Sequence, residues 1–527
     1  IDPQTTEQLA SINGVRWVDM LPEWQLYNDK ATDVMNVRSV WNNHGLYGQG
    51  QVVGVCDTGV DRGSILPANL HDDFENGSGA SRVLQIIDRV GDGGNDVNSG
   101  HGTHVCGSVL GNGARSGSTP SSHTYPNTSY VGMAPEAQLV MQAVENNSTG
   151  GLEGLPSDLN TLFQQSYNAG AHIHTNSWGS AEAGQYSIDS QNVDLFSWNN
   201  PTFTILFAAG NDGVDVNTSN GVVDLSSIGS PGTAKNCITV GATENNRPSP
   251  FNSGSWGTYW PNDFPNDPIR NDPTANNPVG MAAFSSRGPT SDGRYKPDIS
   301  APGTYVASTK SSAMSGACGW GDINTNYCYM GGTSMATPLT AGATALVREF
   351  FTDQGLTPSS ALLKATLVNG ATELYPGQYG TDGTREQPTY RPNNVQGWGR
   401  VNLENTLFPV SPRMLDTFDF TEGLQTNEYD TFRFNLSDTS ESLRSTLAWT
   451  DYPGTPAAGG GLVNDLDLEV TAPNATIYYP TNAQKRSSTM MGMYDTDPAY
   501  SVSTRSSRQY AVRFTPTAYP VNLERAV

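Results

Sequence analysis

The chain has 527 residues, more than one ordinary hydrophobic core supports, so two or three domains are expected. Its 28 basic and 51 acidic residues give a net charge of −23, which argues against nucleic acid as a partner and fits a soluble secreted protein or one with cation sites. No apolar run approaches the roughly 18 residues that a membrane-spanning helix needs, so no membrane span is expected.

The first half of the chain alternates between two kinds of segment. Residues 1–30 show no long periodic element, and we expect an N-terminal arm there. From about residue 51, short β-branched runs alternate with helical stretches such as LPSDLNTLFQQSYNAG; the runs are QVVGVCDTG, AQLVMQAV, AHIHTNSWG, TFTILFAAGN and NCITVGAT. This alternation predicts βαβ units that build a parallel sheet, with functional residues at the strand ends.

Two later stretches differ from this pattern. Residues 247–279 are rich in Pro, Asn and aromatic residues, and we expect a long surface insertion there. After about residue 410, short alternating segments are separated by turn residues, as in DTFRFNLS, STLAWTD, DLDLEVTAP and QYAVRFTP. Such segments predict an antiparallel β-sandwich or jelly roll.

The five cysteines fall into two groups. Cys318 and Cys328 flank the short polar loop GWGDINTNY, which suggests a surface disulfide. Cys56, Cys106 and Cys237 lie in apolar segments and are expected to be buried thiols, although Cys56 and Cys106 could pair with each other. No CxxC spacing occurs, which argues against a zinc site.

The segment GGTSMATPLTAG surrounds Ser334 with small residues. Pro338 is expected in the first turn of a helix, where its missing N–H costs nothing. Ser334 would then stand at a helix N-terminus, where the local field favours developing negative charge, as a nucleophile requires. A glycine turn that merely starts a buried helix explains this stretch equally well.

A serine nucleophile needs a general base that is itself oriented by a carboxylate. Asp57 follows a buried strand, where a lone carboxylate would be costly without a partner, and His101 opens a glycine-flanked helix. Taken singly, Asp57 could be a turn residue and His101 a helix cap. The three residues together, in the order Asp, His, Ser, predict a catalytic triad unlike that of α/β-hydrolases.

The order and the motifs resemble those of the subtilisin-like serine proteases over roughly residues 31–408. The matching segments are VCDTGV around Asp57, GHGTHVCG around His101, NSWG at 176–179, AAGN at 208–211, FSSRGP at 284–289, KPDISAPG at 296–303 and GGTSMATP at 331–338. The resemblance implies an α/β fold with a parallel sheet flanked by helices. It also implies that Asn211 donates its amide to the oxyanion, beside the backbone N–H of Ser334.

The same resemblance implies the substrate groove. The segments SWG at 177–179 and AAG at 208–210 would line the first specificity pocket, and Gly229 would form its floor. GGLEG at 150–154 would supply an edge strand that pairs with extended peptide. Because the floor carries no charge, we expect cleavage after large apolar or aromatic residues, with broad selectivity. The groove residues are Gly151, Leu152, Glu153, Gly154, Ser177, Trp178, Gly179, Ala208, Ala209, Gly210 and Gly229.

The resemblance extends to a longer alkaline-protease branch in which a β-sandwich follows the catalytic domain. The expected domains are an arm or propeptide remnant at 1–30, a catalytic domain at 31–408 and a β-sandwich at 409–527 that is incomplete or continued by a further segment. A propeptide in residues 1–28 would make the protein a zymogen and act as its inhibitor. The resemblance also implies structural calcium, which is common in the family. The candidate ligands are Asn464, Asp465 and Asp467.

The sequence therefore predicts a secreted, monomeric serine endopeptidase that hydrolyses polypeptides through an acyl-enzyme. A binding protein built on an inactive protease fold is a second possibility, although no triad position or oxyanion donor is substituted. A third is that the sandwich acts as a targeting module for carbohydrate or protein, although residues 410–527 show no aromatic stripe typical of a sugar platform.

Overall fold

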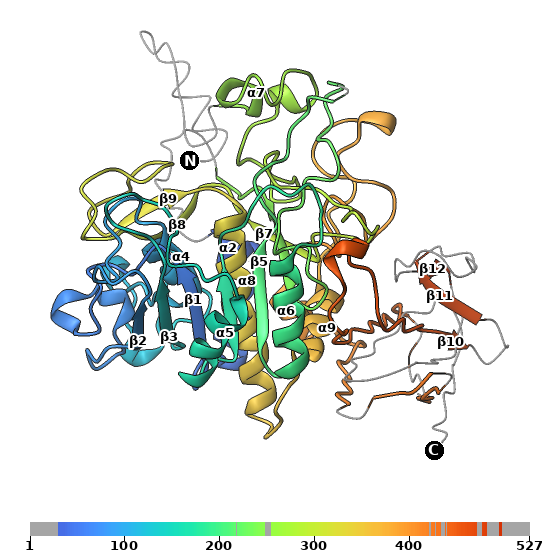
Figure 1. Cartoon of the computed structure of the whole chain (residues 1–527), viewed down its shortest axis with the longest axis horizontal. Helices are drawn as coiled ribbons and strands as arrows, with labels where there is room; N and C mark the ends of the chain where they lie inside the picture. The colour runs from blue at the N-terminus through green and yellow to red at the C-terminus, as the bar shows by residue number, and fades with distance from the viewer. Residues whose placement is uncertain are drawn as a thin grey trace, which may run out of the picture.

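The computed structural model describes residues 30–217, 219–247, 254–420, 423–426, 428–433, 438, 440–471, 477–481 and 495–497. A seven-stranded sheet lies at the centre, with strand order β2-β3-β1-β4-β5-β6-β7 (Figure 1). Each neighbouring pair runs parallel, as the sequence predicts. The strands are β1 Val52–Asp57, β2 Val83–Asp88, β3 Gln138–Ala143, β4 Ile173–Asn176, β5 Thr204–Ala208, β6 Ile238–Thr243 and β7 Ile299–Pro302.

Helices connect and flank these strands. They are α2 Lys30–Val34, α3 Val37–His44, α4 His101–Leu110, α5 Leu159–Asn168, α6 Ile188–Asn199, α7 Trp256–Tyr259, α8 Thr333–Thr352, α9 Ser360–Gly370 and α10 Leu403–Leu407. Short 3₁₀ turns occur at η1 Pro67–Asn69, η2 Asp72–Phe74, η3 Ala114–Ser116, η4 Pro120–Ser122, η5 Ile269–Asn271, η6 Asp382–Thr384 and η7 Pro456–Ala458. Within the described ranges, no helix combines the length and the hydropathy needed to cross a bilayer.

The sheet separates two hydrophobic clusters. Successive residues of β1 point to opposite faces, so Val55 joins the cluster that contains α4 and α8, while Cys56 joins the cluster formed with α5 and α6. The central strands are buried along nearly their whole length, as expected of a parallel sheet that is covered on both sides. Helix α8 runs along the sheet and contacts β4 to β7 (Figure 1).

The described part of the insertion, residues 254–279, is more than a surface feature. Trp256, Phe264 and Ile269 are buried and belong to the main hydrophobic cluster, and the indole N–H of Trp256 donates to Glu244 at 3.0 Å. The Pro and Asn content indicated a loop, but it did not show that the aromatic residues fold inward. The expectation of a surface insertion is therefore wrong for these side chains.

Smaller antiparallel sheets complete the described structure. β8 (Val306–Thr309) pairs with β9 (Tyr327–Met330), and β10 (Val470–Thr471), β11 (Ile477–Thr481) and β12 (Asp495–Asp497) form a three-stranded sheet to one side of the parallel sheet (Figure 1). Residues 445–451 (STLAWTD) have no assigned strand. The full sandwich stays a prediction, because QYAVRFTP and the second half of DTFRFNLS lie outside the described residues. Residues 1–29 of the predicted arm lie outside them as well.

The segment that follows the α/β region is attached to it by a buried ion pair. The Lys235 ammonium donates to the Asp451 carboxylate at 2.6 Å and to the carbonyl oxygens of Tyr452 and Gly461 at 2.5 and 3.2 Å. The side chains of Lys235 and Asp451 are only 3% and 2% exposed. Residues 451–461 therefore pack directly on the α/β region.

Candidate active site

Two of the predicted triad residues, Asp57 and His101, are in direct contact at the carboxyl edge of the parallel sheet, and Ser334 contacts Ser177, which follows the neighbouring strand β4. Asp57 is the last residue of β1, and β1 and β5 flank β4, whose end precedes Ser177. His101 is the first residue of α4, and Ser334 is the second residue of α8. Crevices at this edge are where parallel α/β sheets bind their ligands, so the topology gathers residues that are far apart in the sequence.

Asp57 and His101 form a short hydrogen-bonded pair. The Nδ1 atom of His101 lies 2.6 Å from Oδ1 of Asp57, and the backbone N–H of Thr58 donates to the same oxygen at 2.8 Å. The carboxylate is buried, whereas the imidazole is 26% exposed. If Nδ1 carries the proton for Asp57, Nε2 is the atom left to act as a base.

The pKa of His101 lies above its ordinary value of 6.5. Burial alone would lower it, but the charge of Asp57 and the hydrogen bond to it outweigh burial, and the charges of Asp96 and Glu145 add to the rise. A carboxylate partner of this kind both orients the ring and stabilises its protonated form.

Ser334 lies at the start of a buried helix. Gly332, which precedes this helix, has a φ of +146°, a backbone conformation that residues other than glycine rarely adopt. The Ser334 hydroxyl donates to the backbone carbonyl of Ser177 at 3.1 Å rather than to His101. Because the helix begins at Thr333, Pro338 lies in its second turn, so the prediction of a first-turn proline is wrong.

Asn211 lies beside the N-terminus of this helix. Its side-chain oxygen accepts from the backbone N–H and the hydroxyl of Thr333 at 2.8 and 3.0 Å. These two bonds fix the amide and leave its NH₂ group as a donor that has no partner among the described residues. That nitrogen would lie 3.4 Å from a Cβ placed on Gly332, so it faces the backbone next to Ser334.

The predicted pocket segments come together next to Ser334. The backbones of Ser180 and Ser230 pair at 2.8 and 3.0 Å, and the N–H of Gly229 donates to the carbonyl of Ala209 at 2.9 Å. A Cβ on Gly229 would lie 2.9 Å from the carbonyl of Ser180, and one on Gly179 would lie 2.8 Å from that of Ser230. The two glycines therefore permit the close backbone approach.

Two predicted groove features differ from expectation. The ring of Trp178 faces inward, because its N–H donates to the Cys56 carbonyl at 3.1 Å and it packs edge-on against Phe207. Residues 150–154 have no assigned strand, and Glu153 and Gly154 lie in a turn. In this segment, Gly151 and Gly154 bond back to Asn146 and Val144, and side chains of Asn146 and Thr149 hold the Glu153 carboxylate at 2.8 and 2.7 Å.

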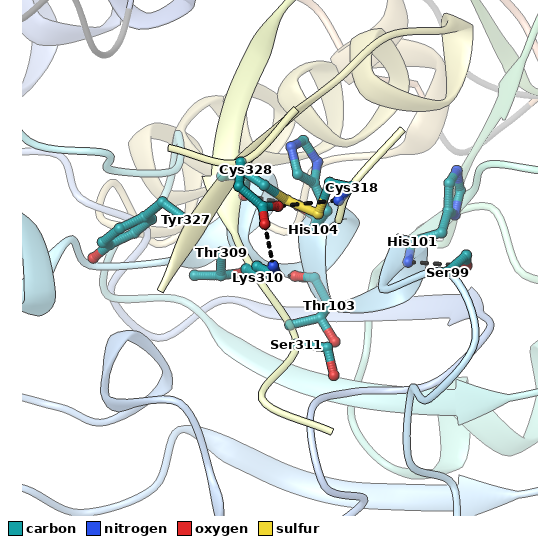
Figure 2. Close-up of a disulfide and its surroundings, with 12 residues drawn as sticks. Ser99, His101, Thr103, His104, Thr309, Lys310, Ser311, Cys318, Tyr327 and Cys328 are labelled. Atoms are coloured by element: carbon teal, nitrogen blue, oxygen red, sulfur yellow. Dashed lines mark hydrogen bonds and ion pairs between the residues drawn. A yellow bond between two sulfur atoms is a disulfide. The ribbon is translucent and has the colours of Figure 1, made fainter. Parts of the chain in front are cut away.

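The predicted disulfide joins Cys318 and Cys328, with an S–S distance of 2.05 Å. Figure 2 shows the bond beside His104 on α4, one turn from His101. Cys56, Cys106 and Cys237 are free and buried, so Cys56 and Cys106 do not pair. Burial raises the pKa of the Cys56 and Cys106 thiols, which keeps both neutral and unreactive although each lies close to a triad residue.

The predicted calcium ligands Asn464, Asp465 and Asp467 follow Asp451 in the same segment of the chain, and the backbone N–H of Asn464 donates to Asp451 at 2.8 Å. Burial, followed by the charges of Asp467 and Asp451, raises the pKa of Asp465 to about 6. A carboxylate destabilised by neighbouring carboxylates is compatible with a bound hard cation. Among the described residues, the group of three or more His, Cys, Asp or Glu side chains with atoms close enough to share an ion is Cys318, Asp322 and Cys328, and the disulfide consumes both of its sulfurs.

Comparison with known proteins shows the family to which this chain belongs. A sequence model described as the subtilase family matches residues 48–399. The serine protease AprX of Bacillus subtilis (strain 168) is 30% identical over 413 residues, with 76% of each chain covered. The chain therefore belongs to the subtilase family, whose members include serine proteases.

Other relatives are much longer than this chain. The serine protease/ABC transporter B family proteins tagD and tagB of Dictyostelium discoideum are 28% and 29% identical and cover 83% and 80% of this chain, which spans only 28% and 26% of their lengths. The solved structure of the Clostridium perfringens CspB protease covers 73% of this chain and 98% of its own, with a TM-score of 0.50 and 17% identity. That likeness supports the subtilisin-like α/β fold.

Proposed function

We propose that the chain is a serine endopeptidase in which Ser334, His101 and Asp57 act as the triad. The observation that carries the proposal is the 2.6 Å Asp57–His101 pair at the end of β1, together with Ser334 at the start of a helix and in contact with Ser177 after the neighbouring strand β4. In the resting arrangement the Ser334 hydroxyl rests on Ser177, so attack requires that it rotate toward Nε2 of His101. Apo enzymes often show such loose geometry before substrate binds.

The reaction proceeds in two halves. The Ser334 oxygen attacks the peptide carbonyl carbon while Nε2 of His101 takes the hydroxyl proton, and the carbonyl π electrons move to the oxygen. The C–N bond then breaks, and His101 gives its proton to the leaving amine, which leaves an acyl ester on Ser334. Water attacks that ester by the same route and releases the acid. Asp57 holds the ring and stabilises its charged form in both halves.

The developing oxyanion is bound by two donors. These are the NH₂ group of Asn211 and the backbone N–H of Ser334, one of the N–H groups that a helix N-terminus leaves without a partner inside the helix. Because Thr333 fixes the Asn211 amide from its other side, this donor is oriented before substrate arrives. Preorganised donors of this kind stabilise the transition state without reorganisation.

We also propose a preference for large apolar or aromatic residues before the cut bond. The support is the uncharged backbone lining around Gly179, Ala209 and Gly229. Profiling with a peptide library should show cleavage after Phe, Tyr, Leu or Met by the wild type and none by Ser334→Ala. Strict cleavage after Arg or Lys would contradict the pocket assignment, and cleavage by Ser334→Ala would contradict the triad.

Secretion and structural calcium complete the proposal. A disulfide is typical of an oxidising compartment, which supports secretion. Asn464, Asp465 and Asp467 would hold calcium through oxygen atoms and so stabilise the segment that packs on Lys235. A melting temperature that is unchanged by a chelator would count against calcium. The monomeric state and the inhibitory propeptide in residues 1–28 stay predictions.

A further inference from the structure

Pro338 creates an unfilled hydrogen-bond position in the helix that carries the nucleophile. In an α-helix the N–H of residue 338 would donate to the carbonyl of residue 334. Proline has no N–H, and its ring crowds the carbonyl four residues earlier. The backbone carbonyl of Ser334 therefore lacks its usual partner within α8.

The hydroxyl of Ser177 fills this position from another part of the molecule. It donates to the Ser334 carbonyl at 2.8 Å, across 157 positions in the sequence. Ser177 is only 6% exposed, so bulk water has little access to replace this bond. A buried carbonyl left without a donor is destabilising, so the Ser177 hydroxyl stabilises the start of α8 by supplying the missing hydrogen bond.

A second bond joins the same two residues in the opposite sense. The Ser334 hydroxyl donates to the Ser177 carbonyl at 3.1 Å, which is long for an O–H···O bond. The shorter bond holds the Ser334 backbone, and the longer one holds the Ser334 hydroxyl on the Ser177 carbonyl. The hydroxyl can thus turn toward His101 while the backbone that carries it stays in place.

We propose that the Ser177 side chain is a positioning residue for the nucleophile, replacing the helix hydrogen bond that Pro338 removes. This inference rests on the proposed function. It adds a role for the side-chain hydroxyl of Ser177, a residue that the pocket assignment already includes. Because a small displacement of a reacting atom reduces rate much more than binding, loss of this hydroxyl should lower kcat and leave KM nearly unchanged.

The test is a double-mutant cycle on the full chain, with rates normalised to active sites titrated by a fluorophosphonate. Ser177→Ala keeps the backbone carbonyl and removes only the hydroxyl, and kcat should fall on the order of 10–100-fold. Pro338→Ala restores the N–H for the Ser334 carbonyl. The double variant should therefore recover to within about threefold of Pro338→Ala alone, which is the non-additivity expected of a shared partner.

Ser129→Ala is the matched control, since Ser129 is also buried and its hydroxyl donates to a backbone carbonyl at the same 2.8 Å, that of Pro126 and not of Ser334. It should stay within about twofold of wild type. A Ser177→Ala kcat equal to wild type, or a deficit that persists undiminished in the Pro338→Ala background, would overturn the inference. Absence of fluorophosphonate labelling in the wild type would instead overturn the proposed function, so the two failures are distinguishable.

Discussion

Two buried contacts between a carboxylate and a basic side chain differ in how completely their hydrogen bonds are filled. In the pair between Lys235 and Asp451, the ammonium has three acceptors, and both carboxylate oxygens also accept backbone N–H groups, from Val463 and Asn464. In the pair between Asp57 and His101, the buried Oδ2 of Asp57 has no partner among the described residues.

The difference separates a structural contact from a reactive one. A buried ion pair in which every donor and acceptor is hydrogen-bonded holds its two side chains in one arrangement. Removing either partner leaves the other charge buried and unpaired. A pair whose imidazole is partly exposed, and whose Nε2 has no partner among the described residues, can accept a proton and return it. The same test picks out Asn211, whose oxygen accepts two hydrogen bonds while its NH₂ group has no partner in the described part of the chain.

The largest expected effect comes from removing the base while keeping a donor for Asp57. His101→Gln can still donate to the carboxylate but cannot take a proton from Ser334. We expect kcat/KM to fall ~10²–10⁴-fold, the usual contribution of a general base. The free energy of unfolding should stay within about 1 kcal/mol of wild type. A loss of about 3–5 kcal/mol, the size expected when a buried ion pair is broken, would show that the Asp57–His101 pair is structural, like the pair between Lys235 and Asp451.

The opposite result is expected at the filled pair. Lys235→Met should lower the free energy of unfolding by about 3–5 kcal/mol, because Asp451 is left charged and buried. The kcat of the folded fraction should be unchanged. Lys310→Met is the matched control, since its 2.5 Å pair with Asp322 is near the surface and should contribute less than about 1 kcal/mol. If urea unfolding showed the same loss in free energy of unfolding for Lys235→Met and Lys310→Met, the assignment of the Lys235–Asp451 pair as a structural contact would be contradicted.

Asn211→Leu sharpens the comparison at a neutral side chain. It removes the free NH₂ donor, and kcat should fall ~10²–10³-fold, the magnitude known for such a donor in the prototype of this family. KM should change little, because the donor acts on charge that develops only in the transition state. Steady-state kinetics on one peptide substrate measures both constants. An increase in KM with kcat unchanged would make Asn211 a ground-state contact.

The smallest expected effect concerns acid stability. Burial would raise the pKa of Asp298, but the charges of Lys296 and Lys364 outweigh burial and hold it at about 2. Since the folded pKa lies below the unfolded one, this carboxylate contributes stability above about pH 4 that is lost as the pH falls toward 2.

The contribution amounts to about 2 kcal/mol. Unfolding measured from pH 5 to pH 2 should therefore show a shallower loss of stability for Asp298→Asn than for the wild type. Parallel curves for the two proteins would contradict this charge assignment.

The sequence predicted the parts of the fold and site that depend on local pattern. The β-branched runs located strands β1, β3, β4, β5 and β6, and the glycine-framed motifs located Asp57, His101 and Ser334. What it missed depends on long-range contacts. The position of Pro338 in the sequence did not show that α8 begins at Thr333, which places the proline in the second turn. Nor did it show that the Ser177 hydroxyl donates to the Ser334 carbonyl in place of the missing proline N–H.

Loops show the same limit. The glycines of residues 150–154 are as compatible with a turn as with an edge strand, and side-chain bonds from Asn146 and Thr149 to Glu153 select the turn. The aromatic residues of the insertion are buried because a neighbouring surface, formed by residues distant in the sequence, is there to receive them. Local composition carries no information about that surface.

Fluorophosphonate labelling followed by peptide mapping tests the central claim most directly. The wild type should carry the label on Ser334 and lose hydrolytic activity in step with labelling. His101→Gln should label far more slowly, and Ser334→Ala should not label at all. Label on a different serine, or peptide hydrolysis that survives full modification of Ser334, would contradict the assignment of this serine as the nucleophile.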